Sequence, residues 1–305
     1  MGSFMSILKK GINKTGESLE SYSFLAPAYL IFIIFIFIPV LRSFYLSFFD
    51  YSLLSFNNPE FAKFANYLEL INDDVFWVAL KNTVVYSLGT VPVKVAIGLF
   101  IALMLDSNKL IGKTFFKTTY FIPVVTSMVA SSIIWTMVFN SSEFGLANRL
   151  ISILGVTPKG WLADSNYAMF SVITMSIWKS VGQCMIIYIA GLQGIPLEVY
   201  EAADIDGATS WKKFLHVTLP LLKPTTFFLL TTQIIGAFQV FTQTYIMTGG
   251  GPGYSTITLL NLLYTKGFQE FDMGYTSTLA VGLFVTLLLM TIILRKLFQS
   301  DEVTY

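Results

Sequence analysis

Six long apolar runs constrain this chain more than any other feature of its sequence. They cover residues 24–46, 83–105, 115–139, 169–190, 225–247 and 277–297. A helix crosses the hydrocarbon core of a bilayer with about 20 apolar residues, so each run is long enough to span it. All 18 acidic residues lie outside the runs, and only Lys94 and Lys179 lie deep within them. Because a charge in hydrocarbon is costly, the pattern predicts an all-α membrane protein with six transmembrane helices in one domain, residues 1–305.

Composition excludes two broad classes of function. With 54% hydrophobic and 12% charged residues, the chain is not a water-soluble enzyme. Its net charge of +1 leaves no basic excess for a nucleic-acid backbone. A phosphate-binding loop of the form Gly-x-x-x-x-Gly-Lys-Ser/Thr is absent, and the glycine-rich stretch at residues 248–253 does not resemble one. The lipid bilayer is therefore a predicted partner, nucleic acid is not, and the chain is not expected to hydrolyse ATP.

The basic residues predict the orientation of the spans, because cytoplasmic loops carry an excess of Lys and Arg. With the N-terminus inside, the inner side carries Lys9, Lys10, Lys14, Lys109, Lys113, Lys117, Lys212, Lys213, Lys223, Arg295 and Lys296. The outer side carries only Lys63, Lys81, Arg149, Lys159 and Lys266, with Arg42 near the end of the first run. Both termini are therefore expected to be cytoplasmic.

Two outer segments are long enough to hold structure of their own. Residues 51–82 mix aromatic and acidic side chains, which favours short amphipathic helices at the membrane surface. Residues 140–166 are rich in turn-forming residues and predict a loop with one short helix near residues 146–154.

The inner segment 194–224 predicts two short helices joined by a sharp bend. Pro196 suits a first helical turn, and Glu198 and Glu201 favour a helix N-terminal end. Gly207 can adopt the left-handed conformation that ends a helix, and Thr209 or Ser210 can cap the next one. A helical pair of this kind can also lie against lipid headgroups, and composition alone does not decide between that and a docking role.

Three runs carry polar stripes at helical spacing, which are candidates for a solute pathway. The third run offers Ser127, Ser131 and Trp135, the fourth Ser176, Lys179, Ser180 and Gln183, and the fifth Thr232, Gly236, Gln239 and Gln243. Amides and hydroxyls suit a polyhydroxylated ligand, and an aromatic ring can stack on a sugar. Hydrogen bonding between helices is the alternative explanation for any one stripe.

Lys179 is the unusual member, because no acidic residue in any run can neutralise it. It can face a water-filled cavity, pair with another chain, lose its proton on burial or meet an anionic solute. Lys94 follows Pro92, which suits a snorkelling or cavity-facing position at a kink, and it receives no role.

The sequence Glu201-Ala202-Ala203-x-x-Asp206-Gly207-Ala208, followed by Leu219-Pro220, resembles the EAA loop of ATP-binding-cassette importer permeases. It lies between the fourth and fifth of the six runs, as in that family. The resemblance extends over almost the whole chain to the carbohydrate-uptake branch, of the maltose and glycerol-phosphate permease type. Asn66-Tyr67, Phe76-Trp77, Asn82-Thr83, residues 190–196, and Thr248-Gly-Gly with Pro252 carry it.

The resemblance implies a type I importer permease fold in a bacterial or archaeal cytoplasmic membrane. It implies that residues 194–224 dock into an ATPase subunit, with Glu201 as a polar contact, Gly207 as the bend, and Ala202, Ala203 and Ala208 as close-packing positions. The implied partners are a second permease, two cytoplasmic ATPases that bind ATP and magnesium, and an extracytoplasmic binding protein that delivers a sugar. The chain itself would need no cofactor and would transport by alternating access.

Two other functions stay open at this point. An importer permease of the same class for a non-sugar or anionic solute would carry the same loop. A secondary transporter would typically carry acidic coupling residues within its spans, and this chain has none there.

The predicted coupling loop leads to a first testable expectation. A Gly207→Asp variant should insert into the membrane normally but lose solute uptake, because a side chain at the bend disfavours the conformation required for docking. Uptake assays and membrane fractionation measure the two effects separately. Normal uptake by this variant would argue strongly against the coupling role.

Overall fold

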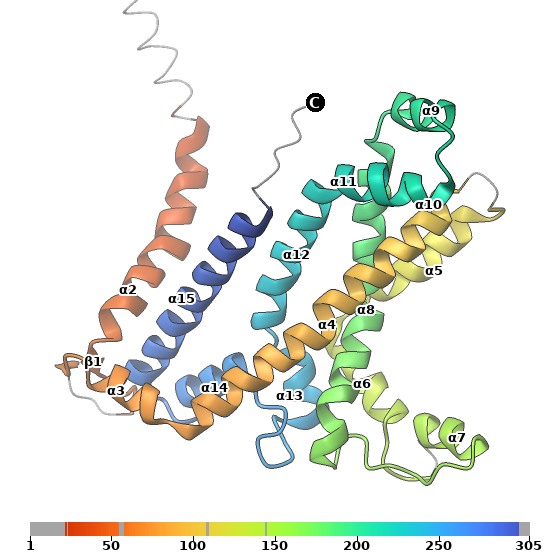
Figure 1. Ribbon diagram of the computed structural model, residues 1–305. Coiled ribbons are helices and arrows are strands. Elements are labelled where there is room, and N and C mark those ends of the chain that lie inside the picture. The colour runs from red at the N-terminus through yellow and green to blue at the C-terminus, as the bar shows by residue number, and fades with distance from the viewer. Residues whose placement is uncertain (1–21, 23, 55–57, 108–109, 144, 299–305) are drawn as a thin grey trace, which may run out of the picture.

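The computed structural model describes residues 22, 24–54, 58–107, 110–143 and 145–298. The chain is almost entirely helical (Figure 1). Its elements are η1 (Ile33–Phe37), α2 (Ile38–Leu46), β1 (Phe49–Asp50), β2 (Glu60–Phe61), α3 (Ala65–Asn72), α4 (Asp74–Asp106), α5 (Lys113–Val125), α6 (Met128–Val138), α7 (Leu146–Ile153), α8 (Ser165–Gln193), α9 (Leu197–Ile205), α10 (Ser210–Lys213), η2 (Phe214–Thr218), α11 (Leu219–Leu221), α12 (Lys223–Phe238), α13 (Thr242–Thr248), α14 (Leu259–Tyr264), η3 (Thr265–Gln269) and α15 (Met273–Phe298).

Within the described ranges, four helices are long and apolar enough to cross a membrane. They are residues 24–46, α4, α8 and α15. The total rises to six when each of two bent helix pairs counts as one span. These pairs are α5 with α6, bent by 99°, and Ser210–Leu221 with α12, bent by 61°. The orientation rests in part on Lys9, Lys10, Lys14 and Lys109, which lie outside the described residues.

Two apolar runs that the sequence predicts as single helices are interrupted in the structure. The run 115–139 forms α5 and α6, with Thr126 and Ser127 at the break. Pro123, near the end of α5, has no N–H to continue the helical ladder. The run 225–247 forms α12 and α13, which are separated at residues 239–241. A hydropathy average over the whole run does not detect such breaks, because the few polar residues at them, Thr126, Ser127 and Gln239, lie among long apolar stretches.

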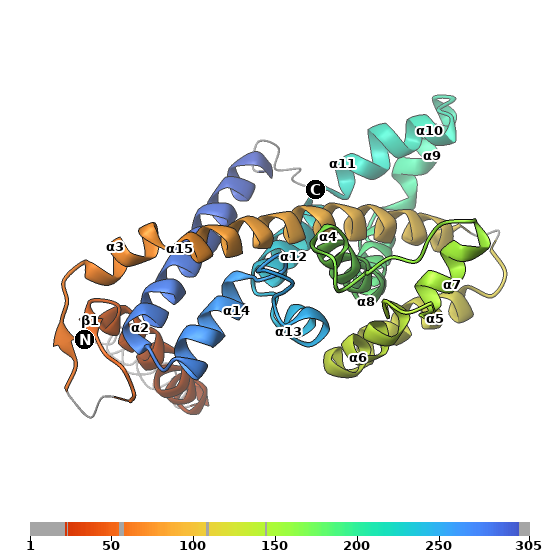
Figure 2. The ribbon, with the colours of Figure 1, turned by 90° about the horizontal axis from the view of Figure 1, so that it is seen from below.

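The core is the long contact between α4 and α8 (Figures 1 and 2). The two backbones approach closely at Gly98, where an added Cβ would lie 2.6 Å from the Cβ of Cys184. α5 packs on α8, and α12 packs on α4. α2 packs with α15, away from this centre. In Figure 1, α9 and α10 lie at one end of the molecule, while α3, α7, α13 and α14 lie at the other.

The outer segments contain more than the short surface helices predicted for residues 51–82. β1 and β2 form a small antiparallel pair with Phe49 opposite Phe61, a departure from a purely helical fold. The Asn66 amide on α3 fixes the turn before them by donating to the carbonyls of Ser47 and Phe49. The helix predicted near residues 146–154 is confirmed as α7.

α7 is anchored by a single buried amide. The Nδ2 of Asn148 lies within hydrogen-bond distance of four carbonyls, which share its two N–H donors: those of Asn140, Ser141, Ser142 and Lys159. Its Oδ1 accepts from the Lys159 N–H and the Trp161 indole. One side chain therefore satisfies the backbone on both sides of α7.

The packing of α5 on α8 predicts the effect of filling Gly182. An added Cβ there would collide with the Tyr120 carbonyl oxygen, so Gly182→Ala should displace α5 and destabilise the fold by about 1–3 kcal/mol. Gly236→Ala is the matched control, since Gly236 is also helical and has nothing within 4 Å of its Cβ position. A thiol-reactive dye can follow thermal unfolding through the buried Cys184. Equal unfolding midpoints for the two variants would contradict this account.

Candidate functional site

The inner loop between α8 and α12 folds as a helix, a left-handed bend and a second helix. α9 ends at Ile205 with Asp206 as its C-cap. Gly207 has φ +71°, and its N–H donates to the Asp204 carbonyl at 3.1 Å. The Ala208 N–H donates to the Ala203 carbonyl at 2.9 Å. This pair of bonds is a Schellman motif. Nothing lies within 4 Å of a Cβ built at Gly207, so the backbone conformation, and not lack of space, requires glycine there.

Side chains close the bend and hold the second helix. The Lys213 ammonium contacts the Asp204 carboxylate at 2.7 Å. The Thr209 hydroxyl caps α10 by accepting from the Lys212 N–H. Further along, the Tyr200 hydroxyl hydrogen-bonds Thr218 at 3.0 Å and ties α9 to η2. The bend is therefore fixed by contacts within the loop itself.

The loop presents both acidic and apolar groups to its surroundings. Glu201, Ala202, Asp206 and Gly207 are exposed, whereas Ala203 and Ala208 are partly buried. Ile205 is 87% exposed at the tip. On the membrane side, Trp211 and Phe214 join Leu99, Phe100 and Leu103 of α4 around a cavity of about 500 Å³. The arrangement leaves most of α9 exposed, and it places Trp211 and Phe214 beside the same cavity as residues of α4. The docking role of the loop residues stays a prediction.

The polar stripes divide between the interior and the surface. Ser176 and Gln243 are buried and meet at Tyr86 of α4, a residue that the sequence analysis did not select. The Gln243 amide donates to the Tyr86 hydroxyl at 2.8 Å, and the Ser176 side chain lies beside this hydroxyl. These side chains therefore join α4, α8 and α13. In the sequence, the feature that marks Tyr86 is a tyrosine within an apolar run, followed by the polar residues Ser87 and Thr90.

Other members of the stripes lie on the surface or at its margin. Gln183, Thr232 and Gln239 are exposed, while Ser180 is partly buried. Trp135 is partly buried, and its ring packs against Trp178 with centroids 5.5 Å apart. The structure thus divides the stripe residues between the buried interior and the exposed surface. It leaves the exposed amides accessible to a solute or a second chain.

Lys179 has partners that were not among the alternatives considered from the sequence. Its side chain is buried, and its ammonium donates to the carbonyls of Pro123, Val124 and Thr126. No ion pair to Lys179 occurs in the described ranges. The other lysine within a run, Lys94, is also buried, on α4 after Pro92. Lys94 therefore does not snorkel to the surface in this conformation.

The resemblance motifs at the outer end contact one another. The Asn82 amide donates to the carbonyls of Tyr254 and Ile257, and the Thr83 hydroxyl accepts from the Leu259 N–H. Within the glycine-rich loop, the hydroxyls of Thr248 and Thr256 are 2.7 Å apart. Asn82 and Thr83 therefore hold the chain that follows residues 248–253 against the start of α4.

Acidic residues from distant segments also gather at this end. The Tyr275 hydroxyl donates to Asp73 at 2.5 Å, and the Lys266 ammonium contacts Glu270 at 2.8 Å. Burial and the neighbouring carboxylate of Asp272 raise the pKa of Glu69. The hydrogen bond that Lys266 donates to Glu270 raises the pKa of Lys266. The hydrogen bond from Tyr275 to Asp73 ties α15 to the outer segment before α4.

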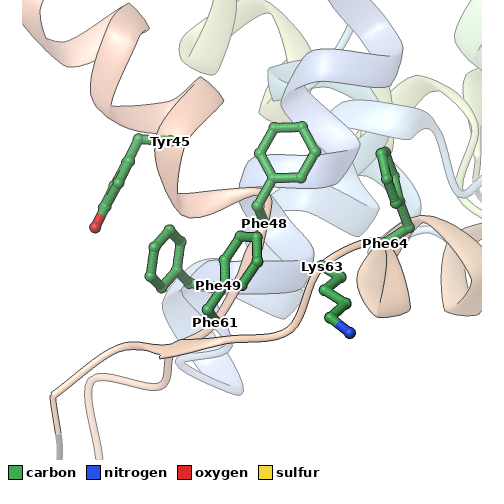
Figure 3. A pocket seen from close by; sticks show the side chains of 6 residues that line it. All are labelled: Tyr45, Phe48, Phe49, Phe61, Lys63 and Phe64. Carbon is green, nitrogen blue, oxygen red and sulfur yellow. The ribbon is translucent and has the colours of Figure 1, made fainter.

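An open aromatic cavity of about 570 Å³ lies at the outer end of α2 (Figure 3). Its lining consists of Tyr45, Phe48, Phe49, Phe61, Lys63 and Phe64. Figure 3 shows the Lys63 amine pointing away from the rings. Aromatic rings at the end of an apolar helix are typical of the membrane–water interface. The lining offers few polar groups to a sugar.

Comparison with known proteins places these features in one family. Residues 94–299 match the family model described as the binding-protein-dependent transport system inner membrane component. The arabinooligosaccharides transport system permease protein AraP of Bacillus subtilis is 36% identical, with 92% of this chain and 88% of the relative covered. The lactose transport system permease protein LacF of Rhizobium radiobacter is 34% identical, with 98% and 99% covered.

A solved structure has the same fold. It is a crystal structure of a bacterial ABC transporter involved in the import of the acidic polysaccharide alginate, with a TM-score of 0.80 at 22% identity. The alignment covers 94% of this chain and 97% of that one. The family consists of transporter permease subunits and not of catalytic enzymes. The chain therefore belongs to the inner membrane components of binding-protein-dependent transport systems.

Proposed function

We propose that the chain moves a sugar or oligosaccharide into the cytoplasm of a bacterium or archaeon, as one permease of an ATP-driven importer. The observation that carries the proposal is the near full-length similarity to AraP and LacF, whose names specify arabinooligosaccharides and lactose. The exposed amides of Gln183 and Gln239 support it, because amides hydrogen-bond well to sugar hydroxyls.

The proposed topology has six spans with both termini in the cytoplasm. In it, α5 with α6 forms the third span, and α12 with its continuation into α13 forms the fifth. The start of residues 24–46 and the end of α15 point to the same side of the molecule as α9 (Figure 1), which supports two cytoplasmic termini. The bias of Lys and Arg toward that side supports the same orientation.

ATP is proposed to act through residues 194–224. Two separate ATPase subunits would bind and hydrolyse it, one of them gripping α9 and α10 of this chain. The exposure of Glu201 and Ile205 supports this docking, because both a charged and an apolar contact are available. Since Trp211 and Phe214 line a cavity together with residues of α4, a displacement of the loop would change the surroundings of a helix that belongs to the core.

A second permease would complete the pathway, and an extracytoplasmic binding protein would deliver the solute. Gln183, Thr232 and Gln239 are exposed on this chain, which suits a pathway between two permeases. Alternating access would then open this surface outward and inward in turn.

The alternative of an anionic solute rested on Lys179. All three of its donors are bonded to backbone carbonyls, so this residue does not support that alternative. The absence of acidic residues from every apolar run likewise does not favour an ion-coupled transporter.

The two classes of glutamine predict different mutant behaviour. Gln239→Leu should raise the KM for uptake with little effect on stability, because Gln239 is exposed. Gln243→Leu should lower the unfolding free energy by about 1–3 kcal/mol, because it leaves the buried Tyr86 hydroxyl without its donor. Uptake of radiolabelled lactose or arabinotriose and thermal unfolding measure the two effects. A pathway that includes Gln239 would be contradicted if Gln239→Leu lowered stability and left the KM unchanged while Gln243→Leu raised the KM.

Purification of the tagged full chain under mild conditions tests the assembly. We expect a related permease and an ATPase to accompany it, with ATP hydrolysis that requires those subunits. A lone chain that takes up solute in response to an ion gradient would refute the proposed function.

A further inference from the structure

The break in the third span leaves backbone carbonyl groups at the end of α5 without partners in their own helix. The last carbonyls of a helix have no intrahelical donor, and hydrocarbon offers no water to replace one. At the end of α5, the Thr126 N–H and its hydroxyl both bond back to the Pro123 carbonyl. The carbonyls of Val124 and Thr126 must be satisfied from another element.

Lys179 supplies those bonds from α8. Its ammonium donates to Pro123 at 2.5 Å, Val124 at 3.0 Å and Thr126 at 2.9 Å. A lysine ammonium has three donors and no acceptor, so its capacity is filled. The C-terminal end of a helix carries partial negative charge, which explains how a cation only 6% exposed is accommodated without an acidic partner.

Neighbouring residues of α8 contact both halves of the broken span. One turn after Lys179, Gly182 allows the Tyr120 carbonyl of α5 to approach the α8 backbone. One residue before it, the Trp178 ring packs on Trp135 of α6. The Thr126 hydroxyl contacts Ser131 of α6 at 3.0 Å and so bridges the break. Lys179 lies between these contacts, at the level of the bend.

We propose that Lys179 is a positioning residue, which holds the third span at its 99° bend by capping α5. Through that bend it sets where α6 lies beside α8, including the exposed Ser127 and the partly buried Trp135. The charge of Lys179 thus serves the shape of the pathway and not the charge of a solute. The requirement of this bend for transport rests on the proposed function, whereas the capping itself does not.

The test measures the bend directly. Spin labels on cysteines at Ile122 of α5 and Ile133 of α6, which are 54% and 47% exposed, report the geometry across the break in a Cys184→Ala background. The full chain is studied in lipid nanodiscs with its co-purifying subunits. Lys179→Met should broaden or shift the interlabel distance distribution, since the α5 carbonyls lose their donors. Lys179→Arg, which keeps charge and donors, should restore it.

Lys94→Met is the matched control, because it removes the other buried lysine of the runs, on α4. It should leave the interlabel distances unchanged. If Lys179→Met does not accumulate in membranes, Lys179→Gln is measured in its place. The neutral glutamine side chain cannot supply three charged donors, so the same change in the interlabel distances is expected. An unchanged distance distribution in the neutral Lys179 variant would overturn the capping proposal.

Uptake of radiolabelled lactose or arabinotriose provides the functional measurement. The uptake rate of the neutral Lys179 variant should fall about tenfold or more relative to the wild type, the effect expected from losing a hydrogen bond to a charged group. Lys179→Arg should recover most of the wild-type rate. An altered bend with undiminished uptake would overturn the positioning role. If the wild type takes up neither sugar, the proposed substrate class fails, while the distance measurement still decides whether Lys179 caps α5.

Discussion

The exclusion of water from hydrocarbon governs this structure, because every backbone polar group within the bilayer must find its partner in the protein. Continuous helices such as α8 meet this requirement by themselves. The two interrupted runs do not. At the break between α5 and α6, Lys179 supplies the missing donors. At the break between α12 and α13, the buried Thr258 hydroxyl donates to the Val240 carbonyl. In both cases the donor comes from an element outside the broken run.

The same constraint sorts the polar side chains of the interior. The buried Gln243 amide donates to the Tyr86 hydroxyl, and the buried Ser176 hydroxyl donates to the Val172 carbonyl of its own helix, so these polar groups already have partners within the protein. Gln183 and Gln239 are exposed instead, and such amides remain available to a ligand or a second subunit. Satisfied groups thus build the scaffold, and exposed groups are the stronger candidates for the pathway. The polar residues of the stripes therefore differ in whether a ligand can reach them.

The inner loop differs from these breaks, because the contacts that hold its bend come from residues close by in the sequence. Gly207 adopts a positive φ, and both capping hydrogen bonds join residues within five positions of each other. The ion pair between Lys213 and Asp204 lies across the same bend. Such a unit can move as one body. In its second half, Trp211 and Phe214 line a cavity together with residues of α4, a helix of the buried core.

The sequence by itself determined the features that depend on local chemistry. Apolar length predicted the regions of the long helices. Pro196, Gly207 and a cap at Thr209 or Ser210 predicted the shape of the inner loop, since each acts on its own backbone. Only the tertiary structure decided where residues 115–139 and 225–247 break, which members of each stripe are buried, and what Lys179 binds. These outcomes depend on contacts between residues more than fifty positions apart, such as Lys179 with Thr126 and Gln243 with Tyr86. Periodicity along one helix shows which side chains share a face, but the packing of other helices decides whether that face meets carbonyls, side chains or the molecular surface.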